Sequence, residues 1–299
     1  MAGGKERELR RRIKSVRSTR KITKAMELIA ASQIARAQAR IATNRPYREG
    51  IASIVREAAK GDPVAAAKLL GAPDEVRSVI VLAIVGDRGL SGSYNSLVLR
   101  ATEREITRLR DGGAAVSVAT VGKKAVSYFR FRGIDVDHSF LGFTDKPTYA
   151  DARDVADAVS IPFALGSADQ VLLVSMRFRS SSSQSVETLQ LLPLPAIEDE
   201  PDDERPAEGY TEFEPDVEEI LQELAPAALA SEVFTALLEG AAAFYTSQQR
   251  AMAAASENAD ELVRTLSRMV NRARQDSITT EIMEIVGGAE ALRQEKEHA

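Results

Sequence analysis

The chain has 299 residues, of which 44% are hydrophobic and 28% charged, and its formal net charge is -5. These values are typical of a folded soluble protein with one sizeable core or two smaller ones, so extensive disorder is not expected. The sequence has no cysteine and only two histidines, which excludes disulfide bonds, thiolate catalysis and zinc–thiolate sites. A histidine-based metal cluster or a Ser-His-Asp triad would depend on His138 alone, because His298 lies beside the last residue.

No apolar run in the sequence approaches the roughly 18 to 20 residues that span a bilayer. The basic N-terminus is followed by charged residues rather than by the apolar segment of a secretion signal. We therefore expect a cytosolic protein that is at most peripheral to a membrane.

Charge is distributed unevenly along the chain. Residues 1–40 hold twelve Lys and Arg against three Glu, a local balance of +9, whereas residues 198–219 hold twelve Asp and Glu against Arg205 alone. The basic end could be a nucleic-acid arm, but it lacks interleaved aromatic residues and the pI of the chain is near 5.4. A basic helix that enters an acidic protein cavity explains the pattern at least as well, and we expect no nucleic-acid partner.

Both ends of the chain have the composition of long helices. Residues 1–60 are predicted as an N-terminal helix interrupted at Pro46, and residues 217–299 as a C-terminal helix with Pro226 as a candidate break. The apolar positions of the N-terminal helix are Ile13, Val16, Ile22, Met26, Ile29, Ile34 and Ile41. Those near the C-terminus step by four and three, as in a coiled coil, and are Leu262, Leu266, Met269, Ala273, Ile278, Ile282 and Ile285. Each end is the only segment long enough to be the partner of the other, so we predict that they pair.

Strands and helices alternate between the two ends, over residues 75–195. Strands are predicted at residues 78–85, 116–121, 134–143, 170–179 and 186–192, and helices at residues 97–110, 123–132 and 150–165. This alternation predicts a Rossmann-like α/β domain with a mostly parallel sheet, which ends in a hairpin with Ser180–Ser183 at its tip. Residues 61–74 are predicted as a linker, and residues 196–216, which are acidic and rich in proline, as an exposed linker loop.

Two segments have features of ligand sites. Gly86–Asn95 follows the first strand and opens a helix, where α/β proteins bind phosphates, but its glycine spacing matches neither the dinucleotide nor the P-loop pattern. Asp135, Asp137 and His138 could ligate a metal if other carboxylates converged on them. A tight turn and an edge strand facing water are the simpler interpretations of these two segments.

A more specific pattern lies near the C-terminus, over residues 271–289. Here polar side chains follow one another on a helix whose other face is apolar. Polar groups at the end of a coiled coil indicate contact with another protein.

Three blocks in the sequence resemble the gamma subunit of the F-type ATP synthase, in its bacterial form. They are Ile22–Ser32, the Asp-Arg-Gly-Leu-x-Gly block at Asp87–Gly92, and the segment from Ala273 to Gly287 that begins Ala-Arg-Gln-x-Ser-Ile-Thr. The three blocks occur in the order typical of that family, and the similarity runs along nearly the whole chain.

The resemblance implies that the terminal helices form an antiparallel coiled coil inside a hexamer of alternating alpha and beta subunits. The α/β domain would lie with the epsilon subunit and the c-ring, with one gamma subunit in each complex. Proton flow would turn the c-ring and this shaft, and the asymmetric shaft would change the nucleotide affinities of three beta sites in turn. The resemblance implies no catalytic residue, cofactor or metal in this chain, and a location at the cytoplasmic face of the bacterial plasma membrane.

By the same resemblance, two groups of side chains would contact the surrounding subunits. They are Lys21, Lys24 and Met26 in the first helix, and Arg274, Gln275, Thr279 and Glu281 in the last. Arg and Gln could form hydrogen bonds with acidic or carbonyl partners and release them again.

The sequence departs from the family pattern at two places. Ser91 stands where the Asp-Arg-Gly-Leu block usually has cysteine, and the usual Ser-Glu-x-x-x-Arg-Met pattern reads Ala243, Phe244, Gln248 and Gln249 at its named positions. Two alternatives to the rotor remain from the residues themselves. One is a stand-alone coiled-coil adaptor with an α/β head, and the other is a nucleotide-dependent enzyme centred on residues 86–95.

Overall fold

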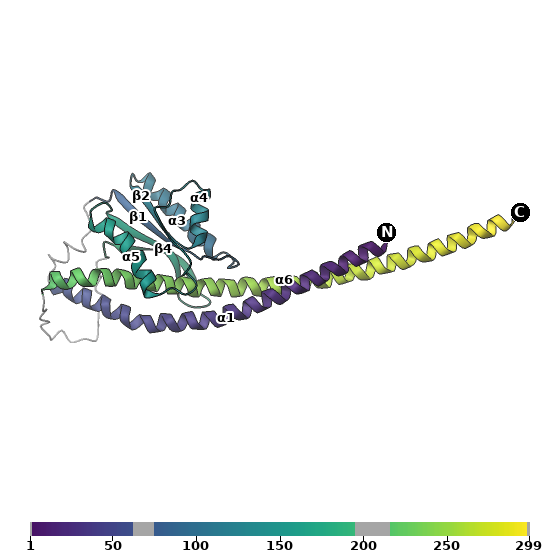
Figure 1. Cartoon of the computed structure of the whole chain (residues 1–299), viewed down its shortest axis with the longest axis horizontal. Coiled ribbons are helices and arrows are strands. Elements are labelled where there is room, and N and C mark those ends of the chain that lie inside the picture. Colours follow the sequence, from purple (N-terminus) through teal and green to yellow (C-terminus); the bar gives the residue numbers. More distant parts are fainter. Residues whose placement is uncertain (1, 62–74, 195–215, 298–299) are drawn as a thin grey trace. The chain divides into compact units, whose positions relative to one another are not determined.

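The computed structural model describes residues 2–61, 75–194 and 216–297 (Figure 1). Its contacts divide the chain into two compact units. We call residues 1–29 with 249–299 the helical unit, and residues 30–248 the mixed unit. The predicted linker at residues 61–74 and the predicted acidic loop at residues 196–216 lie, except for Gly61 and Asp216, outside the described residues.

Two long helices begin and end the described chain. Helix α1 extends from Ala2 to Gly61 and helix α6 from Val217 to Glu297. The predicted interruption at Pro46 is wrong, and Pro226 does not break its helix either. Both prolines are exposed, so water can bind the carbonyl group that each leaves without a partner in the preceding turn.

In the helical unit, α1 and α6 pack against each other in antiparallel directions. Leu9 contacts a cluster of Leu266, Val270 and Ala273, and Arg20 forms an ion pair with Asp260 over 2.6 Å. The hydroxyl groups of Thr23 and Ser256 are 2.7 Å apart. Higher residue numbers in α1 thus meet lower numbers in α6, as the predicted antiparallel coiled coil requires.

The buried stripe of α6 differs from the predicted one. Its buried residues in the helical unit are Met252, Ser256, Ala259, Leu266, Val270 and Ala273. These step by four and three apart from one step of seven, in which the half-buried Val263 lies, and Leu262 and Met269 lie outside the stripe and are exposed. The sequence offers two interleaved apolar stripes, and the one that continues the small residues Ser256 and Ala259 is buried, because small side chains allow the two helices to approach closely.

The mixed unit contains a five-stranded sheet of order β3-β2-β1-β4-β5. The strands are β1 (Ser78–Ile84), β2 (Ala115–Val121), β3 (His138–Phe140), β4 (Gln170–Phe178) and β5 (Gln184–Leu192). The first four run parallel, and β5 pairs with β4 in antiparallel direction. The mostly parallel sheet and its terminal hairpin, with Ser180–Ser183 at the turn, are therefore confirmed.

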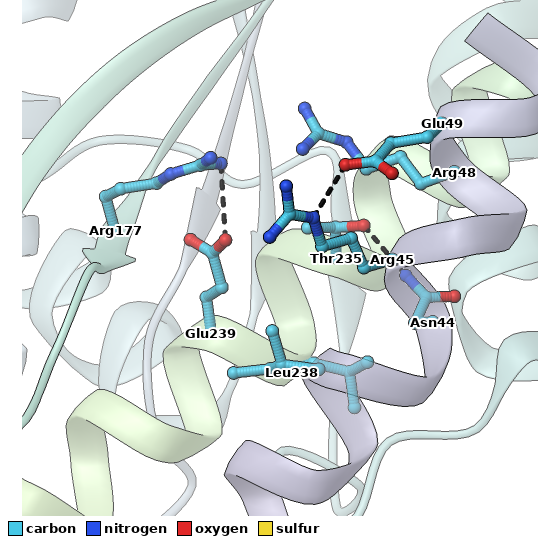
Figure 2. A pocket seen from close by; sticks show the side chains of 9 residues that line it. Asn44, Arg45, Arg48, Glu49, Arg177, Thr235, Leu238 and Glu239 are labelled. Atoms are coloured by element: carbon cyan, nitrogen blue, oxygen red, sulfur yellow. Dashed lines mark hydrogen bonds and ion pairs between the residues drawn. The ribbon is translucent and has the colours of Figure 1, made fainter.

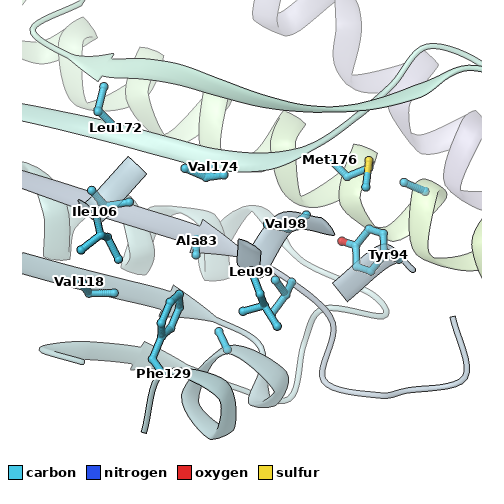
Figure 3. Close-up of a cluster of buried hydrophobic side chains, with 14 of the residues drawn as sticks. Ala83, Tyr94, Val98, Leu99, Ile106, Val118, Phe129, Leu172, Val174 and Met176 are labelled. Atoms are coloured by element: carbon cyan, nitrogen blue, oxygen red, sulfur yellow. The ribbon is translucent and has the colours of Figure 1, made fainter. Parts of the chain in front are cut away.

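Helices cover both faces of this sheet. Alternate residues of β1 point to opposite faces, so its continuous apolar sequence serves two cores. On one face pack α3 (Tyr94–Asp111) and α4 (Lys123–Phe131), which supply Val98, Ile106 and Phe129 to the core in Figure 3. On the other face pack α5 (Tyr149–Ala164) and the part of α6 that carries Leu229, Val233 and Leu237.

The third strand is shorter than predicted. Residues 134–143 were expected to be extended, but only His138–Phe140 pairs with β2. Before the strand, Asp137 accepts a hydrogen bond from the amide of Val118 through its side chain, over 2.8 Å. A side-chain acceptor here replaces the backbone acceptor of a longer ladder.

Helix α6 also has a long apolar stretch. Among the described residues it is the one helix whose length and composition would allow it to cross a membrane, a feature the sequence analysis did not anticipate. However, 83% of its most apolar window is buried within the protein. This stretch is therefore the core helix of the mixed unit.

Candidate functional site

The loop after β1 occupies the place where many α/β proteins hold a phosphate group. In this loop the carboxylate of Asp87 accepts hydrogen bonds from two other segments of the chain. One carboxylate oxygen accepts a hydrogen bond from the amide of Lys123, the first residue of α4, over 3.0 Å. The other accepts hydrogen bonds from the Gly142 amide over 3.0 Å and the Thr144 hydroxyl group over 2.9 Å.

These hydrogen bonds keep Asp87 ionised. Partial burial alone would raise the pKa of Asp87, but the hydrogen bonds from Gly142, Thr144 and Lys123 outweigh burial and lower the pKa below its usual range. The protein's own anion thus lies at the N-terminus of α4. Helix α4 follows β2, so this carboxylate does not lie at the N-terminus of α3, the helix that the loop itself opens.

The rest of this loop is closed by its own side chains. Asn95 accepts a hydrogen bond from the Gly86 amide over 2.8 Å and donates one to the Arg88 carbonyl group over 3.0 Å. Ser91, at the usual cysteine position of the family, is buried. The loop is a tight turn with internal hydrogen bonds, as the simpler interpretation predicted.

The second departure from the family pattern packs against the same loop. The ring of Phe244 meets that of Tyr94 edge to face, with centroids 5.6 Å apart, and a Cβ atom at Gly86 would lie 3.0 Å from it. Phe244 therefore supplies packing between α6 and the loop, where the family pattern has a glutamate.

The metal site considered at residues 135–138 does not form. Within the described parts of the chain, no group of three or more His, Asp or Glu side chains could hold a metal ion. Asp137 instead bonds to the backbone of β2, and Asp135 and His138 are exposed.

The predicted contact residues fall into two groups on the helical unit. Lys21 and Lys24 are exposed on α1, and Met26 is half-buried. The ammonium group of Lys24 lies 2.9 Å from the carboxylate of Glu27. This group is at the level of Ser256 in α6, because Thr23 pairs with Ser256.

The second group lies farther along α6, where Arg274, Gln275, Thr279 and Glu281 are all exposed. The Thr279 hydroxyl group donates a hydrogen bond to the Gln275 carbonyl group over 3.0 Å. From Ser256 to Arg274 the axial distance is roughly 27 Å, at about 1.5 Å per residue. The seven residues therefore form two separate surfaces rather than one site.

Exposed apolar side chains accompany both groups, and the sequence analysis assigned several of them to the buried stripe. They are Ile22, Leu28 and Ile29 near the first group, and Ile278, Ile282, Met283, Ile285 and Val286 near the second. Every described side chain beyond Ser277 of α6 is exposed. For the second group the signal is helix length, because α1 begins at Ala2 and Leu9 already meets Val270 and Ala273, so no stretch of α1 is left to cover α6 beyond Ser277.

Basic side chains line a cleft on the same unit. It has a volume of about 590 Å³, and its lining includes Arg10, Lys14, Arg17 and Lys21 of α1 with Val270 and Asn271 of α6. The clustered positive charge fits an acidic protein surface.

These features define the class of the protein. It is an α/β domain joined to an antiparallel helix pair, whose exposed apolar and basic side chains are suited to contact with other protein chains.

Comparison with known proteins identifies the family. The family model described as ATP synthase matches residues 5–292. An ATP synthase gamma chain of Parafrankia is 44% identical over 97% of this chain and 98% of its own length, and that of Mycolicibacterium vanbaalenii is 42% identical over 97% and 98%. The chain belongs to the ATP synthase gamma chain family.

Solved structures share the fold. A chain of the Euglena gracilis mitochondrial ATP synthase, from a structure of its OSCP, F1 and c-ring parts, covers 98% of this chain and 96% of its own, with a TM-score of 0.68 and 16% identity. A chain of the central stalk and c-ring of the Tetrahymena thermophila enzyme has a TM-score of 0.60 and 24% identity, and covers 79% and 99%. As a member of the gamma family, the chain is the central rotor shaft of an F-type ATP synthase, and the adaptor alternative is set aside.

Proposed function

We propose that the chain transmits rotation from a c-ring to the catalytic sites of an alpha–beta hexamer, and that it has no catalytic residue or cofactor of its own. The observation that carries this proposal is the helical unit, whose second helix continues with exposed apolar side chains beyond Ser277. A helix that exposes such residues is stabilised when other subunits surround it. The alpha and beta subunits are the proposed neighbours.

The remaining partners follow from the relatives. The similar Euglena gracilis chain comes from a structure of OSCP, F1 and a c-ring, and the similar Tetrahymena thermophila chain comes from one of a central stalk and a c-ring. We infer that the α/β domain of this chain meets a c-ring and an epsilon subunit, with one copy of the chain in each complex. The complex would bind the cytoplasmic face of the bacterial plasma membrane, and this chain would be peripheral to it.

The two groups of contact residues would act in different ways. Lys21 and Lys24, beside the basic cleft, would attract acidic segments of the beta subunits as they move. Met26 would add a flexible apolar contact. The second group would form hydrogen bonds with the hexamer that can be exchanged during rotation; its members are Arg274, Gln275, Thr279 and Glu281. Water competes for such polar contacts, so they break more readily than a large apolar interface.

Co-purification tests the partners directly. The chain would be tagged at a loop of the α/β domain and isolated from its native membrane in mild detergent. We expect alpha, beta, epsilon and c subunits in the eluate, in fixed proportion to the tagged chain. A chain that elutes alone from membranes with active ATP synthase would contradict the proposal.

The contact role of the second group can be tested by substitution. Arg274→Ala combined with Gln275→Ala should lower ATP synthesis in membrane vesicles severalfold, because the proposed contacts with the hexamer are lost. Both side chains are exposed, so their removal should leave the folded chain unchanged. The amount of assembled complex should remain within about 20% of wild type. The matched control is Arg110→Ala with Asp111→Ala at the end of α3, which should leave synthesis unchanged. Equal synthesis by both variants would remove Arg274 and Gln275 from the contact surface.

A further inference from the structure

Helix α6 carries buried polar residues at four-residue intervals within the mixed unit. Ser231, Thr235 and Glu239 are each less than 7% exposed. Buried polar groups lower stability unless they are paired, so each must be explained by its contacts. Glu239 is the charged member of this series.

Glu239 connects α6 to the end of β4. One of its carboxylate oxygens lies 3.3 Å from the guanidinium group of Arg177, and the other accepts a hydrogen bond from the backbone amide of Phe178 over 3.2 Å. One side chain therefore contacts both a side chain and the backbone of the same strand. These two contacts fix the position of α6 relative to the end of β4.

Two further polar contacts connect α6 to α1 beside this point. The guanidinium group of Arg48 lies 2.6 Å from the carboxylate of Glu232, and the amide of Asn44 donates a hydrogen bond to the Thr235 hydroxyl group over 3.0 Å. Glu239 and these contacts together tie three elements, α1, α6 and the sheet.

The apolar packing is incomplete in the same place. A cleft of about 260 Å³ lies among α1, α6 and β4 and is lined by Arg177 and Glu239 among others. Figure 2 shows the side chains that line it. A second cleft of about 410 Å³ extends to β5 and shares Arg48, Arg177, Thr235 and Glu239 with the first. The polar contacts of Glu239, Thr235 and Arg48 therefore lie at the border of open clefts, beside the apolar packing of α6 on the sheet.

We propose that Glu239 is a positioning residue, which keeps α6 from slipping along β4 when torque passes between the sheet and the helix pair. The proposal rests on the rotor function. Apolar contacts are non-directional and can be exchanged for similar contacts one step away, whereas the pairing of Glu239 with Arg177 and the Phe178 amide has one geometry. Specifying register is the best-attested role of a buried ion pair, which adds little net stability.

The charge of Glu239 is not favourable for folding by itself. Burial raises the pKa of Glu239, against the effects of Arg177, the Phe178 amide and Arg48, and Glu187 on β5 raises it further. A carboxyl group with a higher pKa in the folded state favours folding below its unfolded pKa, and this advantage is lost as pH rises through the folded pKa. Ionisation of Glu239 therefore does not stabilise the fold, which is expected of a residue retained for position.

The test is Glu239→Gln in the complete ATP synthase, in inverted membrane vesicles. The measurements are ATP hydrolysis and ATP-driven proton uptake, normalised to the assembled complex. We expect unchanged assembly and thermal stability, hydrolysis similar to wild type, and proton uptake per ATP hydrolysed reduced at least threefold. The matched control is Glu49→Gln, which removes the exposed pair of Glu49 with Arg45 at the same junction and should leave the ratio unchanged.

Two outcomes would overturn the proposal. One is a wild-type ratio in Glu239→Gln, and the other is loss of assembly, which would show that the residue serves stability instead. Arg177→Gln provides a second variant, because it also removes the ion pair and leaves an acceptor for the Phe178 amide. Its ratio should fall about as far as that of Glu239→Gln. If wild-type vesicles hydrolyse ATP through a complex containing this chain but take up no protons, the rotor function fails rather than the role of Glu239.

Discussion

Asp87 lies in the loop after β1. Its carboxylate joins this loop to two segments that are distant in sequence, because its oxygens accept hydrogen bonds from Lys123, Gly142 and Thr144. Each of these bonds goes to an ionised group, and such bonds are stronger than those between neutral groups. Asp87 therefore stabilises the loops at this edge of the sheet.

Replacing Asp87 should show this stabilisation and its dependence on pH. We expect Asp87→Asn to lower the free energy of unfolding by about 2 to 3 kcal/mol at pH 7, since Asn can accept fewer of these hydrogen bonds. The pKa of Asp87 is lower in the folded chain than its ordinary 3.8, so its contribution is complete above the ordinary value and is lost as pH falls through the folded value. Urea unfolding of the full chain at pH 7 and below pH 4 measures both effects. A difference between variant and wild type that does not shrink in acid would contradict this account.

Gly122 is constrained by its neighbour as well as by its backbone. Its φ is +100°, and a Cβ atom would collide with the carbonyl oxygen of Val85. Gly113 has a similar φ of +88°, but nothing lies within 4 Å of the position of its Cβ atom.

Comparing Gly122→Ala with Gly113→Ala separates the energetic cost of a steric collision from that of backbone strain. Gly113→Ala should lower the free energy of unfolding by about 1 kcal/mol, from strain alone. Gly122→Ala should cost about 2 to 4 kcal/mol, because strands β1 and β2 must also move apart. Denaturant unfolding of the two full-length variants gives the comparison. Equal losses would show that the close approach of Val85 is relieved at no cost.

At the scale of elements, the sequence predicts the strands and helices of the mixed unit within a few residues at most ends. The alternation of strands and helices over residues 75–195, with the continuous apolar run of β1, predicts the mostly parallel sheet. The prediction fails where a side chain takes over a backbone role, as Asp137 does before β3, and where an exposed proline is tolerated within a helix, as at Pro46. These outcomes depend on solvent exposure, which the local sequence does not specify.

The coiled-coil stripe was predicted with the right period and partly with the wrong members. Leu262 and Leu266 are the same residue type, one helical turn apart, yet their side chains are 41% and 3% exposed. The choice between them is made by the partner helix, through contacts such as that of Thr23 with Ser256. Pairing of this kind cannot be obtained from one helix alone.

Substitution of these two leucines tests the observed stripe. Leu266→Ala should destabilise the helical unit by about 2 to 4 kcal/mol, because it leaves a cavity beside Leu9 and Val270. Amide hydrogen exchange over residues 249–289 should then accelerate by roughly 30-fold or more. Leu262→Ala should change exchange little, since its side chain is exposed already. A larger effect at Leu262 would restore the stripe predicted from the sequence.

At the scale of the whole molecule, the sequence blocks at residues 22–32, 87–92 and 273–287 suffice to predict the family. The blocks alone do not show what their residues do in the folded protein. The structure gives the reasons for the middle block, because Asp87 and Asn95 close the loop with their own hydrogen bonds. The contact roles of Lys21, Lys24 and Met26, and of the four residues in α6, remain predictions, since such roles depend on the surfaces of other subunits.

The central claim is that this chain turns inside a hexamer of other subunits, and rotation of the chain tests it most directly. Because the sequence has no cysteine, Asp111→Cys at the exposed end of α3 provides one reactive site for a bead. The hexamer would be fixed to a surface through its beta subunits, and the bead observed while ATP is hydrolysed. The account predicts rotation in one direction, with three pauses in each turn. A bead that stays in place on complexes shown to hydrolyse ATP would contradict it.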